Sequence, residues 1–328
     1  MSTKSVPVLQ ICKITGRQVG QFPSIREASR TMGVHIKSLQ QAINRPTRSC
    51  AGYIWRTESP LDQIIATPKN PTKRVLFLDI ETAPYEAYIW RMWKQDIFPV
   101  QIISDWYIMT WSAKWLDHDE VFSDRLTGKE AIQENDERLM TTLWPYLDAA
   151  DVVITHNGSR FDMPKIKTKF LQHSLAPPSF YKELDTLKVA RAEFSFAHNT
   201  LDYIASFFGM EGKMKTELDL WIEAKHGNNE ALAYMEEYNK RDVEVLENVY
   251  LRFRPWIKSH PNMDLYLDTA EPNCPRCGSS DIEIIPGKYV YTQAVKYPMY
   301  RCNSCKGISR GKKGLKYNHK KQISSIPR

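Results

Sequence analysis

The chain has 328 residues, of which 42% are hydrophobic and 11% aromatic. That length and composition exclude wholesale disorder and predict two or three packed domains. The longest apolar runs, such as residues 75–78, are strand-length and far too short to cross a bilayer, and residues 1–4 lack the apolar stretch of a secretion signal. We therefore expect a soluble, cytoplasmic protein with no membrane partner.

The net charge of +7 is unevenly distributed along the chain. Residues 1–74 hold 12 Lys and Arg against 3 Asp and Glu, and residues 273–328 hold 12 against 2. The central residues 75–272 hold the remaining 21 basic and 33 acidic side chains, a net charge of −12. Basic ends are typical of proteins that bind a polyanion, and an acidic centre suits a site for divalent metal ions. Two solvated Lys-rich domains would show the same charge pattern.

Residues 1–57 predict a small unit with a short strand or turn followed by two helices. Ser24 is a candidate N-cap for the first helix, and Glu27 three residues later completes a capping box. Gly33 fits the turn between this helix and the second one. Residues 58–74 contain three prolines and few periodic apolar residues, which predicts a linker.

The residues that close this unit are Gly52, Tyr53, Ile54 and Trp55. The unit resembles the small helix-turn-helix modules appended to phage homing endonucleases, which end in the same Gly-Tyr-x-Trp pattern after two helices. The resemblance implies that the second helix lies in the major groove of DNA. The candidate contacts to DNA are Lys37, Gln40, Gln41 and Asn44. An ordinary solvent-exposed helix surface explains each of these side chains equally well.

The order of the predicted elements in the acidic centre of the chain indicates an α/β domain, because strands come first and then alternate with helices. Residues 75–80 form the strongest predicted strand, since apolar residues dominate them as in a buried central strand. Residues 105–115 and 120–123 are expected to be its antiparallel neighbours. Pro145 is expected to kink or shorten a helix over residues 131–147. The further predicted elements are a strand at 151–155 and helices at 162–171, 188–193, 200–208 and 231–253.

Asp79 and Glu81 lie at the end of the strongest predicted strand. Since side chains alternate along a strand, both project from one face while Leu78 and Ile80 point to the other. Two carboxylates that leave an apolar strand are costly unless a cation meets them. Phosphodiester hydrolysis uses such groups, because two closely spaced metal ions activate water and neutralise the leaving oxygen. A strand that runs out into an acidic turn is the alternative interpretation.

Two later motifs offer further polar groups. Residues 152–162 form a strand, a polar loop and then Asp162 at the start of a helix, with Asn157 as loop support or as a substrate contact. An N-cap role would also explain Asp162. Tyr238 and Asp242 are spaced i and i+4, which places both on one helix face. An ordinary surface helix would carry the same pair.

In this order, Asp-x-Glu, Asn…Phe-Asp and Tyr-x-x-x-Asp resemble the motifs of the DEDD exonucleases, in the branch that carries Tyr (DEDDy). The other branch would place a His near position 237, which is Glu237 here. The resemblance implies an RNase H-like mixed sheet flanked by helices over residues 75–256, with two catalytic Mg²⁺ or Mn²⁺ ions. The implied metal ligands are Asp79, Glu81, Asp162 and Asp242, and the implied water-positioning residue is Tyr238.

Two further acidic residues, Asp185 and Asp202, lie in segments that are similar to family segments between the second and third motifs. We expect both to act as helix caps and turn contacts. Because members of the family remove nucleoside monophosphates from a 3′ end, the resemblance implies a 3′–5′ exonuclease. Its expected substrate is single-stranded DNA or a DNA 3′ end, with RNA still open. Replication or recombination proteins are candidate partners, and a phage origin would place the protein in the host cytoplasm.

Two Cys-x-x-Cys pairs, with 24 residues between them, are formed by Cys274, Cys277, Cys302 and Cys305. Without an export signal, such pairs predict a metal site, and disulfides are the alternative. The pattern resembles a β-rich zinc ribbon over residues 273–310. The resemblance implies one structural Zn²⁺, because four thiolates leave no open coordination position. Gly278 and Gly307 suit the tight turns after each pair.

Residues 257–272 are predicted to link the central domain to the zinc ribbon. A basic tail follows at residues 311–328, and it includes Lys312 and Lys313 as candidate nucleic-acid contacts. The function that these motifs predict is metal-dependent 3′–5′ exonuclease action on DNA by a two-metal mechanism. The alternatives are a structure-specific or homing-type endonuclease on the same core and a non-catalytic DNA-binding recruitment protein.

Overall fold

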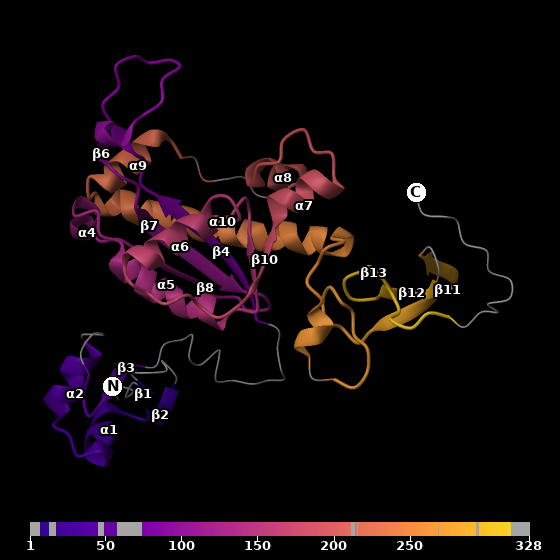
Figure 1. The fold of residues 1–328 in the computed structure, drawn as a ribbon, viewed down its shortest axis with the longest axis horizontal. Helices are drawn as coiled ribbons and strands as arrows, with labels where there is room; N and C mark the ends of the chain where they lie inside the picture. Colours follow the sequence, from indigo (N-terminus) through magenta and orange to yellow (C-terminus); the bar gives the residue numbers. More distant parts are fainter. Residues whose placement is uncertain are drawn as a thin grey trace. The chain divides into compact units, whose positions relative to one another are not determined.

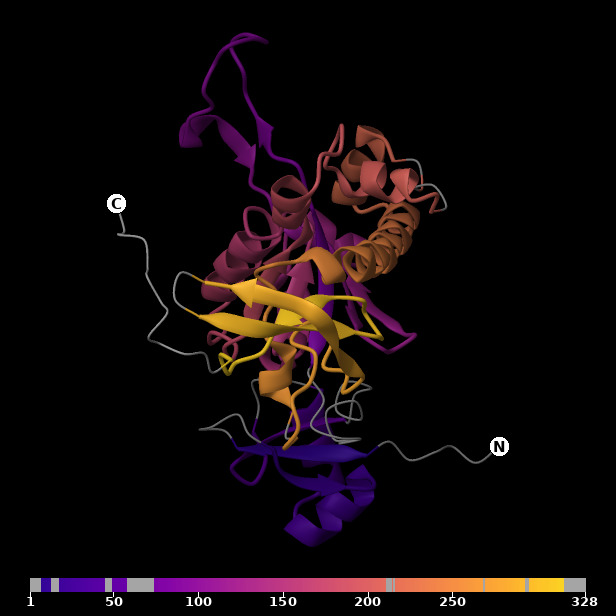
Figure 2. The ribbon, with the colours of Figure 1, turned by 90° about the vertical axis from the view of Figure 1, so that its right-hand side faces the viewer.

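The computed structural model describes residues 7–12, 18–44, 49–57, 74–210, 214, 216–267, 269–292 and 295–315 (Figure 1, Figure 2). The chain divides into two units, Met1–Asn70 and Pro71–Arg328. The predicted linker lies outside the described residues except for Arg74, and so does the predicted basic tail beyond Leu315. Among the residues that are described, no helix combines the length and apolarity that a bilayer crossing requires.

The first unit is a three-stranded antiparallel sheet covered by two helices. Its strands lie in the order β2-β1-β3, so that the first strand is central. The elements are β1 (Val8–Cys12), β2 (Gln18–Phe22), α1 (Ile25–Met32), α2 (Ile36–Ile43) and β3 (Tyr53–Thr57). A small core joins the sheet to the helices, because Val8 and Trp55 pack against Ala28, Leu39 and Ala42. The sheet is more extensive than the short strand or turn that the sequence predicts.

The helix signals in this unit are largely confirmed. The hydroxyl of Ser24 accepts a hydrogen bond from the Glu27 N–H (3.2 Å), so Ser24 is the N-cap of α1. Gly33 ends α1 in the left-handed conformation, with φ of 64°. The capping-box prediction is wrong in one part, because the Glu27 carboxylate pairs with Arg30 (2.7 Å) along the same helix.

The second unit contains a five-stranded mixed sheet in the order β10-β9-β4-β7-β8. The strands are β4 (Val75–Thr82), β7 (Ile108–Trp115), β8 (Val121–Arg125), β9 (Val152–Thr155) and β10 (Lys182–Asp185). The central strand β4 pairs antiparallel with β7 and parallel with β9. The predicted fold class, a mixed sheet flanked by helices, is therefore confirmed, and β7 and β8 are the antiparallel strands that the sequence predicts.

Helices cover both faces of this sheet. They are α4 (Gly128–Ile132), α5 (Glu137–Ala149), α6 (Asp162–Gln172), α7 (Thr186–Glu193), α8 (Leu201–Phe207), α9 (Leu218–Lys225) and α10 (Asn229–Phe253). On one face, Phe77 of β4 packs against Tyr250 of α10, with their ring centroids 5.4 Å apart. On the other face, Trp111 of β7 packs against Tyr146 of α5 (5.1 Å). Because side chains alternate along the strands, Phe77 and Trp111 point to opposite faces, so α10 and α5 lie on opposite sides of the sheet.

Two predictions for this domain are wrong in detail. The predicted helix over residues 131–147 is two helices, because the Asp136 carboxylate accepts the Ile108 N–H (2.9 Å) and Glu134 turns the chain with a φ of 51°. Helix α5 continues through Pro145 to Ala149 and is not shortened by it. Strand β10 and helix α9 were not predicted, nor were the short elements β5 (Glu86–Ala87), η1 (Pro99–Gln101) and β6 (Ile102–Ser104).

The C-terminal part of this unit is β-rich, as predicted. An antiparallel sheet in the order β11-β12-β13 comprises β11 (Ile282–Tyr291), β12 (Lys296–Cys302) and β13 (Ile308–Arg310). The 3₁₀ helix η2 (Arg254–Trp256) directly follows α10, and the segment that the sequence predicts as a linker contains the 3₁₀ helix η3 (Met263–Tyr266). Hydrogen bonds tie this segment to the β-rich part, since Met263 N–H donates to the Pro275 carbonyl (2.8 Å) and Arg276 donates to the Ile257 carbonyl (3.1 Å).

Candidate metal centre

The structure brings the two carboxylates of β4 to the side of the sheet that α10 covers. Asp79 and Glu81 alternate with Ile80 along the strand and share a face with Phe77, which packs against α10. Helix α10 in turn carries Tyr238 and Asp242. One carboxylate oxygen from each of Asp79, Glu81 and Asp242 lies within 4.8 Å of the other two. Residues that are about 160 positions apart in the sequence therefore form one acidic cluster.

Asp162 lies beside this cluster. It is the first residue of α6, it is buried, and its Oδ1 accepts the Ile80 N–H at 3.2 Å. Because Ile80 stands between Asp79 and Glu81, this hydrogen bond holds Asp162 next to the pair. It is not one of the three closely spaced carboxylates. The N-cap interpretation of Asp162 is wrong, since Phe161 occupies that position without a side-chain cap.

Asn239 is a site residue that the motif analysis missed. It is fully buried, and its Nδ2 donates a hydrogen bond to Asp79 Oδ2 at 2.5 Å. Its own Oδ1 is buried with no hydrogen-bond partner among the described residues. The available signal was its place between Tyr238 and Asp242, where a polar residue points toward the sheet. The amide therefore orients one carboxylate of the cluster.

The ionisation of the cluster is strongly perturbed. Burial, followed by the charges of Asp162, Glu81 and Asp242, raises the pKa of Asp79 well above its ordinary value. Burial likewise raises the pKa of Asp162 to about 7. Carboxylates crowded in this way resist simultaneous ionisation unless cations lie among them. The all-oxygen donor set fits Mg²⁺ or Mn²⁺.

The hydroxyl of Tyr238 belongs to the same cluster. Burial and the Asp242 carboxylate, to which the phenol is hydrogen bonded, raise the pKa of Tyr238. The ring is packed edge-on against Trp221 of α9, with the centroids 6.2 Å apart. Tyr238 is consequently a neutral phenol at physiological pH, held in place at the edge of the carboxylates.

The loop before Asp162 is supported by Asp185. The Asp185 carboxylate accepts the backbone N–H of Asn157 (2.9 Å), the hydroxyl of Ser159 (2.7 Å) and the backbone N–H of Leu187 (2.9 Å). This confirms Asp185 as a helix cap and turn contact. Asn157 supports the loop through its backbone, in the left-handed region with φ of 67°.

Asp202 does not cap α8, because the Thr200 hydroxyl accepts the Tyr203 N–H (3.3 Å) and fills that position. The predicted cap role for Asp202 is therefore wrong, and this residue is exposed in the first turn. His156, to which the sequence assigns no role, links Thr186 and the Asn199 carbonyl, each at 2.9 Å.

The four cysteines of the two Cys-x-x-Cys pairs also converge. The Sγ atoms of Cys274 and Cys305 lie 3.6 Å apart and those of Cys277 and Cys302 lie 3.5 Å apart, with all four within 4.8 Å of one another. Tetrahedral Zn²⁺ with Zn–S bonds of about 2.3 Å requires sulfur separations of about 3.8 Å, so the group fits a four-thiolate zinc site.

The turns of this four-cysteine group differ in part from the prediction. Gly278 follows the first pair with a φ of 73°, as expected, but Lys306 with a φ of 63° takes the equivalent position in the second. Gly307 has another role, because an added Cβ would lie 3.0 Å from the Arg276 side chain and 3.2 Å from the Cys305 Sγ.

Six of the predicted nucleic-acid contacts lie on exposed surfaces and far from the carboxylates in the sequence. In the first unit, the four side chains on one exposed face of α2 and its end are Lys37, Gln40, Gln41 and Asn44, while Leu39 and Ala42 face the core. In the second unit, Lys312 and Lys313 are exposed just after β13. The structure places them in the two parts of the chain with a basic net charge.

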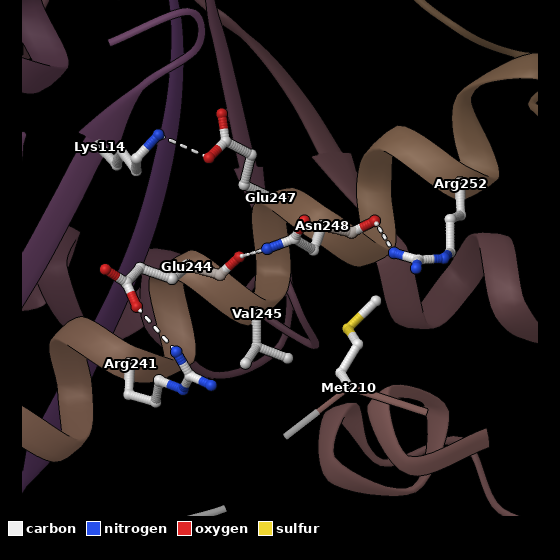
Figure 3. A pocket seen from close by; sticks show the side chains of 8 residues that line it. All are labelled: Lys114, Met210, Arg241, Glu244, Val245, Glu247, Asn248 and Arg252. Atoms are coloured by element: carbon white, nitrogen blue, oxygen red, sulfur yellow. Dashed lines mark hydrogen bonds and ion pairs between the residues drawn. The ribbon is translucent and has the colours of Figure 1, made fainter. Parts of the chain in front are cut away.

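A cavity of about 420 Å³ opens on another face of α10 (Figure 3). Its lining includes Arg241 and Glu244, which form an ion pair (3.3 Å), and Lys114 and Glu247, which form a second one (2.6 Å). None of the clustered carboxylates lines it. The two ion pairs account for four of the five charged side chains in the lining, and the fifth, Arg252, donates to the Asn248 carbonyl (3.5 Å).

Comparison with known family models gives a match within the central domain. Residues 107–253 match the family model described as the RNase_H superfamily. This match supports a nuclease. The matched region includes Asp162 and Asp242 but begins after β4, so Asp79 and Glu81 lie outside it.

No curated protein matches the chain in sequence. Among solved structures, 122 chains match. One of them is the family B DNA polymerase from the hyperthermophilic archaeon Pyrobaculum calidifontis, with 15% sequence identity and a TM-score of 0.41. The match covers 76% of this chain and 35% of the polymerase, so the chain spans about a third of that polymerase's length.

Proposed function

We propose that this protein is a metal-dependent 3′–5′ exonuclease that hydrolyses the phosphodiester bonds of DNA and releases nucleoside monophosphates. The observation that carries the proposal is the convergence of Asp79, Glu81 and Asp242, with Asp162 hydrogen bonded to the strand between the first two. The match of residues 107–253, which include Asp162 and Asp242, to the RNase_H superfamily model supports a nuclease. The 3′–5′ polarity and the preference for DNA come from the resemblance to the DEDDy exonucleases.

Asp79, Glu81, Asp162 and Asp242 are the residues that would hold two Mg²⁺ or Mn²⁺ ions. When bound, such ions supply a hydroxide near neutral pH and offset the charge on the leaving oxygen. Asn239 fixes the orientation of Asp79 through its 2.5 Å hydrogen bond. A buried amide in that position keeps one carboxylate aimed at the cluster before any substrate arrives.

The phenol of Tyr238 would position the attacking water. Its raised pKa keeps the proton on the hydroxyl, so the group acts through a hydrogen bond and does not remove a proton. The hydrogen bond to Asp242 and the packing against Trp221 leave the ring with little freedom. A fixed, neutral hydroxyl next to carboxylates is suited to hold a water in line with the scissile phosphorus.

The other two parts of the chain would bind DNA. In the first unit, α2 presents Lys37 and three amide side chains to solvent, as a helix in a major groove does. In the second unit, one structural Zn²⁺ held by the four thiolates would stabilise the β-rich part. Lys312 and Lys313 follow it. Cations in both parts attract the phosphate backbone of DNA.

The decisive experiment is digestion of end-labelled single- and double-stranded DNA with Mg²⁺ or Mn²⁺. The wild type is expected to release mononucleotides from the 3′ end, and Asp79→Ala is expected to be inactive. Exposed Asp202 gives a matched control, because Asp202→Asn changes a carboxylate outside the cluster. Equal activity of wild type and Asp79→Ala would remove the assigned site.

The same assay separates the two alternatives. Cleavage of a closed circular substrate would show that the protein is an endonuclease on the same core. Tight DNA binding by the wild type without any metal-dependent hydrolysis would replace it by a recruitment protein. Neither alternative has a structural observation in its favour beyond those that also support the exonuclease.

A further inference from the structure

A long insertion between β4 and β7 projects from the central domain. We define residues 84–106 as the arm. At its foot the Ala83 N–H donates to the Tyr107 carbonyl (2.9 Å), and further out β5 pairs antiparallel with β6. In Figure 1 and Figure 2 the same segment extends as a narrow loop away from the sheet, so both views show that it is not folded back onto the domain.

The tip of the arm is an ordered turn. The Gln95 side-chain oxygen accepts the backbone N–H groups of Trp90 (3.3 Å) and Arg91 (3.4 Å), and the Arg91 guanidinium donates to the Lys94 carbonyl (2.8 Å). Farther down, the Gln101 side chain bridges the two legs, because it donates to the Tyr88 carbonyl (2.8 Å) and accepts the Phe98 N–H (3.0 Å). These hydrogen bonds all lie within the arm.

The foot of the arm is clamped to the domain. The Lys225 ammonium, at the end of α9 and almost fully buried, donates to the Pro84 carbonyl (2.9 Å) and pairs with Glu86 (3.3 Å). On the other leg, the Ser104 hydroxyl donates to the Glu134 carboxylate (2.6 Å). Since both legs are held, the direction in which the tip projects is set by the domain.

The arm presents large, apolar side chains to solvent. Trp90 is 92% exposed, Trp93 is 79% exposed and Tyr88 is 72% exposed. Aliphatic neighbours such as Met92 and Val100 are exposed as well. A built structure that turns several aromatic rings to solvent marks a binding surface, because such exposure is unfavourable in an isolated domain.

The tip also carries positive charge. Arg91 and Lys94 lie between and beside the two tryptophans, so the rings alternate with cations along the turn. Exposed rings that alternate with cations fit single-stranded nucleic acid, whose bases stack on the rings while the phosphates meet the cations. Duplex DNA hides the faces of its bases and would not use the rings.

The arm is continuous with the metal centre. It begins two residues after the end of β4, the strand that holds Asp79 and Glu81. Its last residue, Trp106, packs its ring under the Lys165 ammonium (3.8 Å), and Lys165 lies one turn after Asp162 on α6. A nucleic-acid strand whose end lies at the carboxylates would therefore have the foot of the arm beside it.

We propose that the arm binds unpaired bases of the nucleic-acid strand whose end lies at the carboxylate cluster, with Trp90 and Trp93 as the stacking platforms. This inference rests on the proposed function. It makes a single-stranded end the preferred substrate, because only unpaired bases expose the faces that the two rings require. Selection for single strands is then a property of the arm, and hydrolysis is a property of the cluster.

The test uses the full-length protein and the double variant Trp90→Ala/Trp93→Ala, with Trp256→Ala as the matched control. Trp256 is also exposed, at 63%, and lies after α10. Binding is measured by fluorescence anisotropy in Ca²⁺ with a short single-stranded oligonucleotide and with an abasic oligonucleotide of the same length. Hydrolysis is measured with the single-stranded oligonucleotide and with the p-nitrophenyl ester of thymidine 5′-monophosphate, which has no neighbouring bases.

The double variant is expected to lose at least about 25-fold in affinity for the base-bearing strand, since each of the two stacked bases contributes about 5-fold or more. Its KM for the oligonucleotide should rise, while hydrolysis of the ester and binding of the abasic strand stay unchanged. The Trp256→Ala control should match the wild type in every assay. Thermal denaturation establishes that each variant is folded.

Two results would overturn the inference. Unchanged affinity of the double variant for the base-bearing strand would mean that the arm serves another surface, such as a protein partner. An equal loss for base-bearing and abasic strands would mean that the rings do not stack on bases. Failure of the proposed function gives a different result, because the wild type would then hydrolyse neither the oligonucleotide nor the ester while the binding comparison still reports on the arm.

Discussion

The carboxylate cluster predicts an unusual stability difference for Asp162→Asn in protein free of Mg²⁺ and Mn²⁺. Burial raises the pKa of Asp162 from its ordinary value of 3.8 to about 7. Each tenfold change in an ionisation equilibrium corresponds to about 1.4 kcal/mol, so ionised Asp162 destabilises the metal-free fold by about 4 kcal/mol. Asparagine has nearly the same shape and still accepts the Ile80 N–H. It carries no charge at any pH.

The sign of the pH dependence follows from the raised pKa. The folded state binds the Asp162 proton more tightly than the unfolded chain, so this group stabilises the fold fully below pH 3.8. The contribution is lost as the pH rises from 3.8 to about 7. At pH 8, Asp162→Asn should therefore be more stable than the wild type, by up to about 4 kcal/mol or about 8–16 °C in melting temperature. At pH 4 the two should coincide.

Differential scanning calorimetry at several pH values measures this difference directly. The buffer is depleted of Mg²⁺ and Mn²⁺ without a chelator, so that the proposed zinc at the four-cysteine group is not removed. Asp202→Asn is the control and should follow the wild type, because Asp202 is exposed. Added Mn²⁺ should stabilise the wild type but not Asp162→Asn. The reasoning is refuted if Asp162→Asn is less stable than the wild type at pH 8 in metal-depleted buffer.

Three further predictions concern single side chains. Replacement of Asn239 by Ala should lower kcat by about 10- to 100-fold and weaken Mn²⁺ binding, because Asp79 loses its orienting hydrogen bond. Titration of activity with Mn²⁺ measures this effect, and unchanged metal dependence would exclude the role. Replacement of Tyr238 by Phe should lower kcat by about 100-fold and leave DNA affinity unaltered, since only the water-positioning hydroxyl is removed; an equal change in affinity would contradict it. Cys277→Ser should lower the zinc content, measured by mass spectrometry, and the melting temperature, whereas Cys50→Ser, outside the cluster, should change neither.

Local patterns in the sequence were enough to predict the orientation of several residues of the candidate site. Asp79 and Glu81 alternate with apolar residues on a strand, and Tyr238 and Asp242 recur at helical spacing, so their faces follow from backbone geometry alone. The N-cap at Ser24 and the left-handed turn at Gly33 follow in the same way. Each of these features depends on residues within a few positions of one another.

Contacts between distant segments decided the rest. The sequence places Asn239 between Tyr238 and Asp242, but its amide meets Asp79 only because α10 packs on β4. The break near Glu134 exists because the Asp136 carboxylate meets a strand almost 30 residues earlier. The arm looks like an ordinary apolar stretch in the sequence, and only the structure shows that Trp90 and Trp93 stay exposed.

By itself the sequence determined which residue types are available and on which face of a strand or helix each one lies, because backbone periodicity is a local property. The tertiary structure alone decided which of those faces meet. Side-chain ionisation, amide orientation and exposure all depend on what packs against a group, and that neighbour is supplied by segments as far apart as β4 and α10.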